Sequence, residues 1–341
     1  MRELSDEHAA RPACSKAEER VARWCARQLG DLGYDVTVER FVAREAKPWH
    51  AGFFGFAALG ALAIGILPLA GFVVGVVALV LYARDLEGRP LVRLPSGESR
   101  NVVGRTPGRP DLVIVAHLDS GRAPSKRRVH LLATHGVLLL TPLAAAVAWV
   151  AGDEVFAPRM RWITAALLAT SLILVTMFEM WSTSRVGSGS RGDNAGGIGV
   201  ALRLAARRPA GVWFVFTGAK ESGMFGIQAF LDSYAHDVAA ARFLNFDCVM
   251  GDAVVAAWEE GVLRPHEADA VLLSAAEAAG IEASAFRDRP TDGTALLARR
   301  MKALSLVGPH GDEDIDRPGL DRVEQAARRI VQSALDVNAT R

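Results

Sequence analysis

Five residues of the types that bind metal ions follow short apolar runs of this chain or open a helical pattern. His117, Glu221, Asp247 and His310 each come shortly after an apolar run, and Asp193 stands just before a helical pattern. The apolar runs are Leu112–Ala116, Val212–Thr217, Phe243–Phe246 and Leu304–Val307, in that order. Because ligands bind outside the carboxyl ends of the strands in open α/β sheets, we expect these side chains to meet at one site. Two imidazoles and three carboxylates suit zinc, with one carboxylate bridging two ions.

The motifs around these residues follow a particular order along the chain. They read His-x-Asp-Ser, Asp-Asn-Ala-x-Gly, Thr-Gly-Ala-x-Glu-x-Gly, Asn-x-Asp and His-x-x-x-Asp. This order resembles the M28 family of zinc peptidases, which includes many aminopeptidases. The segment Thr291–Thr294 also resembles one that these enzymes carry before their last core strand. The resemblance covers most of the chain outside its long apolar segments.

The resemblance implies a role for each matching residue. His117 and Asp247 would hold one zinc ion, Glu221 and His310 would hold the other, and Asp193 would bridge the two. Two further acids match the family pattern. Asp119 would orient His117, and Asp314 matches the acid that often follows the last histidine by four positions.

One position departs from the family pattern. In the motif that reads Thr-Gly-Ala-x-Glu-x-Gly here, the family usually carries Glu-Glu, the first as general base and the second as zinc ligand, whereas this chain reads Lys220-Glu221. The register against Gly223 and Gly226 aligns Glu221 with the ligand, so Lys220 stands at the place of the base. An ammonium cannot accept a proton, and Lys220 serves as a base only when it is deprotonated, a form that two nearby zinc ions would favour. The sequence leaves open whether the protein is an active peptidase or a catalytically impaired relative.

The composition indicates membrane spans. The chain has 341 residues, half of them hydrophobic, and a mean hydropathy of +0.18. Its net charge of +1 implies no nucleic-acid partner. The three cysteines form no Cys-x-x-Cys pair, which argues against a disulfide framework.

Two long apolar segments predict four transmembrane helices in two hairpins. The first segment carries no charge, and Pro68 divides it into helices at about 49–67 and 69–83. The second segment supplies helices at about 131–150 and 162–181, each about as long as a bilayer core requires. The alternative for all four is a buried core helix.

The order of the ligands along the chain predicts how these segments cross the bilayer. His117 precedes the second apolar segment and Asp193 follows it, so that segment crosses an even number of times if both residues reach one metal centre. The predicted peptidase-like domain comprises 1–48, 84–129 and 183–341, with transmembrane hairpins at 49–83 and 130–182. Basic residues, Arg44 among them, flank the domain side of the hairpins, whereas the far loops carry only Arg159 and Arg161. This bias predicts a cytoplasmic domain.

These observations predict a membrane-bound, M28-like zinc metallopeptidase with two zinc ions. The fold class is α/β, with a mixed, mostly parallel sheet, helices on both faces and two inserted transmembrane hairpins. The predicted partners are a peptide substrate, cut at its free N-terminus by analogy with the family, and the lipid bilayer; the sequence identifies no protein partner. The alternatives are a catalytically impaired membrane scaffold, a transporter-associated membrane protein, and cyclase chemistry at a single zinc ion.

Overall fold

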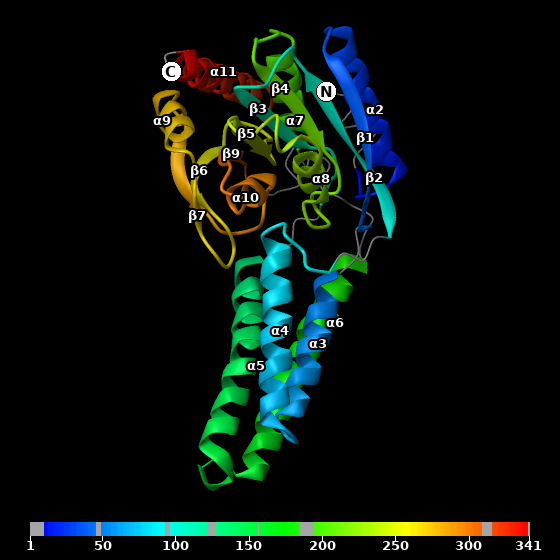
Figure 1. Ribbon diagram of the computed structural model, residues 1–341, viewed down its shortest axis with the longest axis vertical. Coiled ribbons are helices and arrows are strands. Elements are labelled where there is room, and N and C mark those ends of the chain that lie inside the picture. The colour runs from blue at the N-terminus through cyan, green and yellow to red at the C-terminus, as the bar shows by residue number, and fades with distance from the viewer. Residues whose placement is uncertain are drawn as a thin grey trace.

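The structure, a computed structural model, consists of an α/β part and a stalk of long helices that projects from it (Figure 1). It describes residues 10–45, 49–92, 96–121, 127–155, 157–184, 194–308 and 316–339. The predicted ligands Asp193 and His310, and also Asp314, lie outside these ranges.

One mixed sheet forms the centre of the α/β part. Its strand order is β1-β2-β4-β3-β5-β9-β6-β7, and β8 pairs with β6. The strands are β1 Asp35–Ala43, β2 Gly97–Arg105, β3 Leu112–His117, β4 Val212–Thr217, β5 Arg242–Asp247, β6 Val255–Glu260, β7 His266–Glu267, β8 Glu282–Phe286 and β9 Lys302–Val307. The four central strands β4, β3, β5 and β9 run parallel, and the antiparallel pairs β1–β2 and β6–β9 lie to either side. The predicted mixed α/β fold is confirmed, with its parallel part at the centre.

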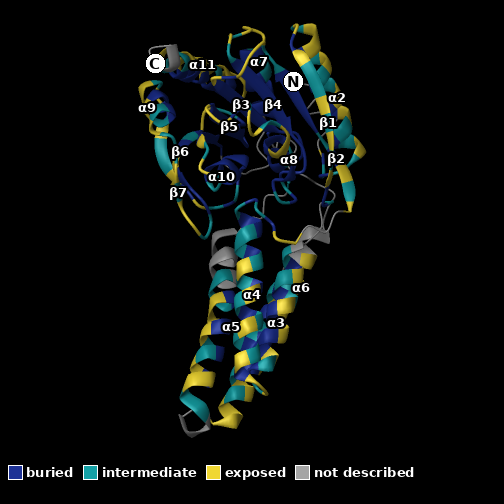
Figure 2. Ribbon diagram, viewed as in Figure 1, coloured by how far each residue is buried: buried dark blue, intermediate teal, exposed yellow. Residues whose placement is uncertain are grey.

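Helices cover both faces of the sheet, which explains why the central strands β3, β4 and β5 are buried along their whole length. Alternate residues of β3 enter different cores: Ile114 packs in the cluster of one face and Val115 in that of the other. The first face is covered by α2 Lys16–Asp31, α7 Ala195–Ala205, α9 Ala270–Ala278 and α11 Arg317–Ala339. The second is covered by α8 Phe225–Tyr234 and α10 Asp292–Leu297. Figure 2 shows the sheet buried between these layers.

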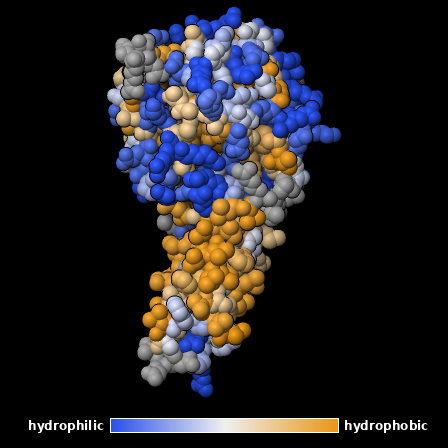
Figure 3. All heavy atoms as spheres, viewed as in Figure 1, coloured by the Kyte–Doolittle hydropathy of each residue, from blue (hydrophilic) through white to orange (hydrophobic). Residues whose placement is uncertain are grey.

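The stalk consists of α3 Trp49–Ala63, α4 Pro68–Leu86, α5 Arg127–Val155 and α6 Pro158–Ser184. Its helices pack in a ring, with α3 between α4 and α6 and with α5 against α4 and α6. Glycines allow the close contacts, since a Cβ atom at Gly71 would lie 2.8 Å from the carbonyl oxygen of Gly60. The face of the stalk seen in Figure 3 is mostly apolar, with hydrophilic atoms near its far end. Side chains such as Ile66 are largely exposed on the stalk.

Among the described residues, three helices are long and apolar enough to cross a membrane: Pro68–Leu86, His135–Gly152 and Pro158–Phe178. The segment His50–Ala63 of α3 is a shorter apolar helix. The 15 residues of α3 extend over about 22 Å. The sequence predicted a helix at 49–67, but the chain leaves the helix at Ala63 and turns before Pro68, which is the first residue of α4.

The two ends of each helix pair meet again in the α/β part. For the first pair, the amide of Ser96 donates a hydrogen bond to the carbonyl oxygen of Ala43, at 3.0 Å. For the second pair, Asn194 Nδ2 donates to the carbonyl oxygen of His117, at 3.1 Å. Each pair of stalk helices is therefore inserted between segments that are neighbours in the α/β part.

An ion pair buried at the junction joins the stalk to the α/β part. Arg44 Nη2 lies 2.7 Å from Asp85 Oδ1, and His50 Nε2 lies 3.1 Å from Asp85 Oδ2. Arg44 is one of the basic residues predicted to flank the membrane, but its side chain is buried in the ion pair with Asp85, near the end of α4. Arg44 therefore does not contribute to an exposed basic flank.

Two glycine-to-alanine substitutions test the packing of α7 against the sheet. A Cβ atom at Gly196 would lie 1.9 Å from the carbonyl oxygen of Val249, so Gly196→Ala should lower the free energy of unfolding by about 1–3 kcal/mol. A Cβ atom at Gly30, which also lies in a helix, would meet nothing within 4 Å. Gly30→Ala should therefore raise the free energy of unfolding by about 0.5–1 kcal/mol. Thermal unfolding in detergent measures both. Equal melting temperatures for the two variants would contradict this packing.

Candidate metal centre

Adjacent parallel strands bring His117 and Asp247 together. His117 ends β3 and Asp247 ends β5, and the register pairs the residues that precede them, Ala116 with Phe246. His117 Nε2 lies 3.8 Å from Asp247 Oδ2. Both side chains are buried, with 1% and 0% of their surface exposed. This is the convergence at the carboxyl ends of the strands that the sequence predicted.

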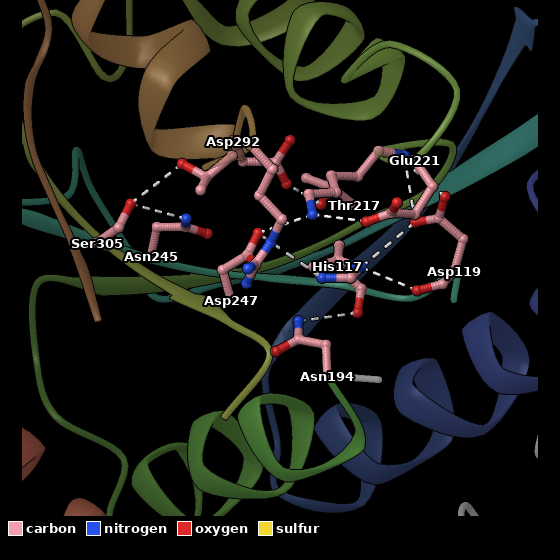
Figure 4. Close-up of polar contacts among 12 residues, drawn as sticks. His117, Asp119, Asn194, Thr217, Glu221, Asn245, Asp247, Asp292 and Ser305 are labelled. Atoms are coloured by element: carbon pink, nitrogen blue, oxygen red, sulfur yellow. Dashed lines mark hydrogen bonds and ion pairs between the residues drawn. The ribbon is translucent and has the colours of Figure 1, made fainter. Parts of the chain in front are cut away.

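The chain around Asp119 fixes the ring of His117. His117 Nδ1 lies 2.9 Å from the carbonyl oxygen of Asp119 and 3.5 Å from its carboxylate. A carbonyl oxygen only accepts, so Nδ1 carries the proton and the lone pair of the neutral ring is on Nε2, which faces Asp247. The carboxylate of Asp119 accepts hydrogen bonds from the backbone amides of Lys220 and Glu221, at 3.1 and 2.8 Å. Asp119 thus holds the histidine by its backbone and the next loop by its side chain (Figure 4).

Lys220 lies between two of the predicted zinc ligands. Its Nζ atom is 2.6 Å from Glu221 Oε1 and 2.9 Å from Asp247 Oδ2. Burial alone would lower the pKa of Lys220, but the carboxylates of Asp247 and Glu221 outweigh it and hold the pKa well above its ordinary value. These contacts favour the ammonium. The neutral form of Lys220, which two nearby zinc ions would favour, stays a prediction for the zinc-loaded protein.

A second buried cation, Arg289, was not found by sequence reasoning. Its Nη2 and Nε atoms lie 2.6 and 3.2 Å from Asp247 Oδ1, and Nη2 also donates to the carbonyl oxygen of Gly308, at 3.4 Å. Burial alone would raise the pKa of Asp247, but Lys220 and Arg289 hold it well below its ordinary value. The available signal in the sequence was the position of Arg289, two residues before the segment Thr291–Thr294 that resembles the peptidase family.

Glu221 approaches the loop that follows β3. A Cβ atom at Gly121 would lie 2.0 Å from Glu221 Oε2, so a residue without a side chain is needed there. The side chain of Glu221 remains partly accessible, with 16% of its surface exposed. This carboxylate therefore lies where the buried centre meets the surface.

A layer of buried polar residues lies behind the ligands. Thr217 Oγ1 donates to Asp292 Oδ2 at 2.5 Å, and Asn245 Nδ2 donates to Ser305 Oγ at 2.9 Å (Figure 4). Thr291 caps α10 and donates to the buried carboxylate of Glu260. Burial raises the pKa of Asp292 to about 6.

The structure brings five of the seven predicted site residues together: His117, Asp119, Lys220, Glu221 and Asp247. Asp193 and His310 fall outside the described residues, and their roles stay predictions. Within the described chain, the ligand atoms of His117, Asp247 and Cys248 lie within 4.8 Å of one another, a spacing that suits one metal ion. The sequence analysis did not single out Cys248 as a ligand.

No protein-family model matches this sequence, and no curated protein does. Several solved structures share its fold. A zinc aminopeptidase from Bacillus subtilis is 13% identical, with 99% of this chain and 93% of that chain covered and a TM-score of 0.50. Glutaminyl cyclases are also similar: the Porphyromonas gingivalis structure is 12% identical, with 96% and 94% covered and a TM-score of 0.51, and the Fimbriiglobus ruber structure is 12% identical, with 97% and 92% covered and a TM-score of 0.52. At this identity the likeness shows the fold alone, a mixed α/β fold of the zinc-peptidase type.

The raised pKa of Asp292 predicts a pH-dependent stability. Because the folded pKa of about 6 exceeds the ordinary value of 3.8, the stabilisation is complete below pH 3.8 and is lost as the pH rises through about 6. Between pH 4 and 7 the stability of zinc-free wild type, relative to Asp292→Asn, should therefore fall by about 2.5 kcal/mol. Thermal unfolding of both proteins over this range measures the difference. A difference that stays constant, or grows with pH, would show that Asp292 is already ionised in the fold at low pH.

Proposed function

We propose that this protein is a membrane-anchored, M28-like zinc-dependent hydrolase that acts on peptides at a free N-terminus. The observation that carries the proposal is the buried pair His117 and Asp247 at the carboxyl end of the parallel sheet, with an imidazole nitrogen and a carboxylate oxygen 3.8 Å apart. The fold, shared with zinc aminopeptidases and glutaminyl cyclases, supports it.

The described donors fit a zinc ion. Zinc bound by nitrogen and oxygen at about 2.0–2.2 Å in a tetrahedron separates the two donor atoms by about 3.4 Å, close to the spacing of His117 Nε2 and Asp247 Oδ2. The carbonyl oxygen of Asp119 fixes the tautomer in which Nε2 can bind a metal. Asp193 would complete this site, and Glu221 and His310 would form the second predicted site.

A bound zinc ion polarises a carbonyl group and lowers the pKa of water. Asp119 would orient the ring of His117, and the surrounding chain would exclude solvent from Asp247. Lys220, which donates to two carboxylates, cannot take a proton in that state. Another group would have to accept the proton during hydrolysis.

Lys220 supports a second candidate function, a catalytically impaired protein that binds zinc and peptides without turnover. General bases contribute about 10²–10⁴-fold to rate, and an ammonium at this place would remove that contribution. Cyclisation of N-terminal glutamine remains an alternative reaction on the same fold, and product analysis separates it from cleavage.

We also propose that the stalk spans the bilayer as two hairpins, which divide the α/β domain into 1–48, 84–129 and 183–341. Three of its helices meet the length of a bilayer core. The shorter α3 is held between α4 and α6, which lets it follow them into the membrane. The basic residues Arg84 and Arg89 at the domain end support a cytoplasmic domain, although Arg44 no longer counts toward this bias. Among the stalk residues that the structure describes, no feature favours the transporter-associated alternative over a plain anchor.

Elemental analysis of the purified protein tests the metal centre. Wild type should carry zinc, and His117→Ala should lose most of it because a buried ligand is removed. His236→Ala is the matched control, since His236 is exposed and lies away from the site. The same preparations, incubated with a peptide library, should release N-terminal residues only when zinc is present. Equal zinc content in wild type and His117→Ala would rule out this centre.

Topology is tested with reporter tags on the full chain. Tags at residue 1, near Ser96 and at residue 341 should report the cytoplasm, because paired hairpins return the chain to the same side. A tag between Asp153 and Pro158 should report the opposite side. Accessibility to a membrane-impermeant label measures each position, and one tag of the first group on the outside would refute the paired hairpins.

A further inference from the structure

We propose that a segment near the N-terminus, residues 11–18, positions the candidate metal centre. Within this segment, Arg11 holds the loop that follows His117, and Glu18 holds the loop that carries Glu221. We call the segment the N-terminal clamp. The inference rests on the proposed zinc-dependent function and adds two positioning residues that lie outside the sheet.

Four successive backbone amides in the loop after β4 donate hydrogen bonds to side chains. Two of them donate to the carboxylate of Asp119, as described above. The amide of Gly218 donates to Asn101 Oδ1 at 3.2 Å, and the amide of Ala219 donates to Glu18 Oε1 at 2.7 Å. Because this loop has left the strand, its buried amides need partners other than the neighbouring strands. Side chains from three different elements therefore fix the path of the loop.

Glu18 is itself held firmly in the first turn of α2, with 2% of its surface exposed. Its Oε2 atom accepts from the amide of Cys14 at 2.8 Å, and its own amide donates to the helix cap, Ser15 Oγ, at 3.2 Å. Its contact with Ala219 joins positions 201 residues apart. The backbone of Ala219 is left-handed, with a φ of 51°, which is unfavourable for a residue with a side chain. Loss of the Glu18 acceptor would remove the partner of a buried amide at this point, and the loop would shift.

Arg11 holds the loop after β3 from the same segment. Its side chain is fully buried, and Nε donates to the carbonyl oxygen of Leu118 at 2.8 Å. Its amide donates to Ser120 Oγ at 2.7 Å, and its carbonyl oxygen accepts from the amide of Ser120 at 2.8 Å. Leu118 and Ser120 flank Asp119, whose carbonyl oxygen fixes His117 and whose carboxylate binds the other loop. The N-terminal clamp therefore contacts both loops, and Asp119 connects them.

Metal affinity distinguishes positioning from general stability. Partners that orient metal ligands typically contribute about 10–100-fold to metal affinity, because the ligands are already in place when the ion arrives. A contact that only stabilises the fold leaves the affinity of the folded protein unchanged. Its loss appears in the melting temperature alone.

The test measures the zinc affinity of the full-length protein in detergent, by competition with a chromophoric chelator. Glu18→Ala should bind zinc about 10–100-fold more weakly than wild type. Glu18→Gln keeps a carbonyl oxygen for the amide of Ala219 and should recover most of the affinity. Arg242→Gln is the matched control, because Arg242 is buried at the opposite end of β5 from Asp247 and donates to Asp269 Oδ1 at 3.2 Å. This control should lower the melting temperature and keep the zinc affinity of wild type.

Two further measurements keep the test decisive. Ser120→Ala removes only the acceptor of the Arg11 amide, and it tests the N-terminal clamp if Glu18→Ala does not fold. It should weaken zinc binding about 3–10-fold. The visible absorption of bound Co²⁺ should change in Glu18→Ala, because the ligands move, and should stay that of wild type in Arg242→Gln.

Wild-type zinc affinity in folded Glu18→Ala or in Ser120→Ala would overturn the inference and leave the proposed function standing. A loss of affinity in Arg242→Gln equal to that in Glu18→Ala would also overturn it, since the effect would then follow stability. Absence of tightly bound zinc from wild type would instead refute the proposed function itself, and the inference with it.

Discussion

The candidate centre depends on the compensation of one buried carboxylate. Asp247 is fully buried at the end of the central strand β5, and an ionised group there is stable only with charged or hydrogen-bonding partners. Lys220 and Arg289 supply them from two different loops, one on each oxygen. The loop after β4 and the segment before α10 are thereby both bound to the carboxylate of Asp247. The position of His117 then follows, because β3 is the parallel neighbour of β5.

Parallel pairing explains why much of the centre could be predicted from sequence. His117 and Asp247 each follow an apolar run, and any parallel sheet that contains both runs places their carboxyl ends at the same edge. The same reasoning placed Glu221 in the loop after β4, whereas Lys220 was singled out by the resemblance to the M28 peptidases. This argument needs only the strand pattern and no knowledge of side-chain contacts.

Other features depend on contacts between distant segments, which a local pattern does not contain. Arg289 is separated from Asp247 by 42 positions, and apart from its place two residues before Thr291 its neighbourhood resembles that of a surface arginine. Arg44 was taken as a membrane-flanking residue, but the carboxylate of Asp85 at the end of α4 draws it into the interior. Asp119 was expected to hold His117 by its carboxylate, whereas its carbonyl oxygen lies nearer and its carboxylate binds the next loop. In each case the side chain is positioned by a partner from a distant segment, and that partner lies close only after the strands have paired.

The stalk and the centre are also coupled through the elements beside the site. Gly88, just after α4, packs closely against Ala295 of α10 and against Met224, which follows the Lys220 loop. Arg299 donates to the carbonyl oxygen of Gly88 at 2.9 Å, which fixes the end of α4 to the segment after α10. These contacts place the end of α4 beside α10 and beside the loop that carries Lys220, so this part of the stalk joins the α/β part next to the elements of the candidate centre.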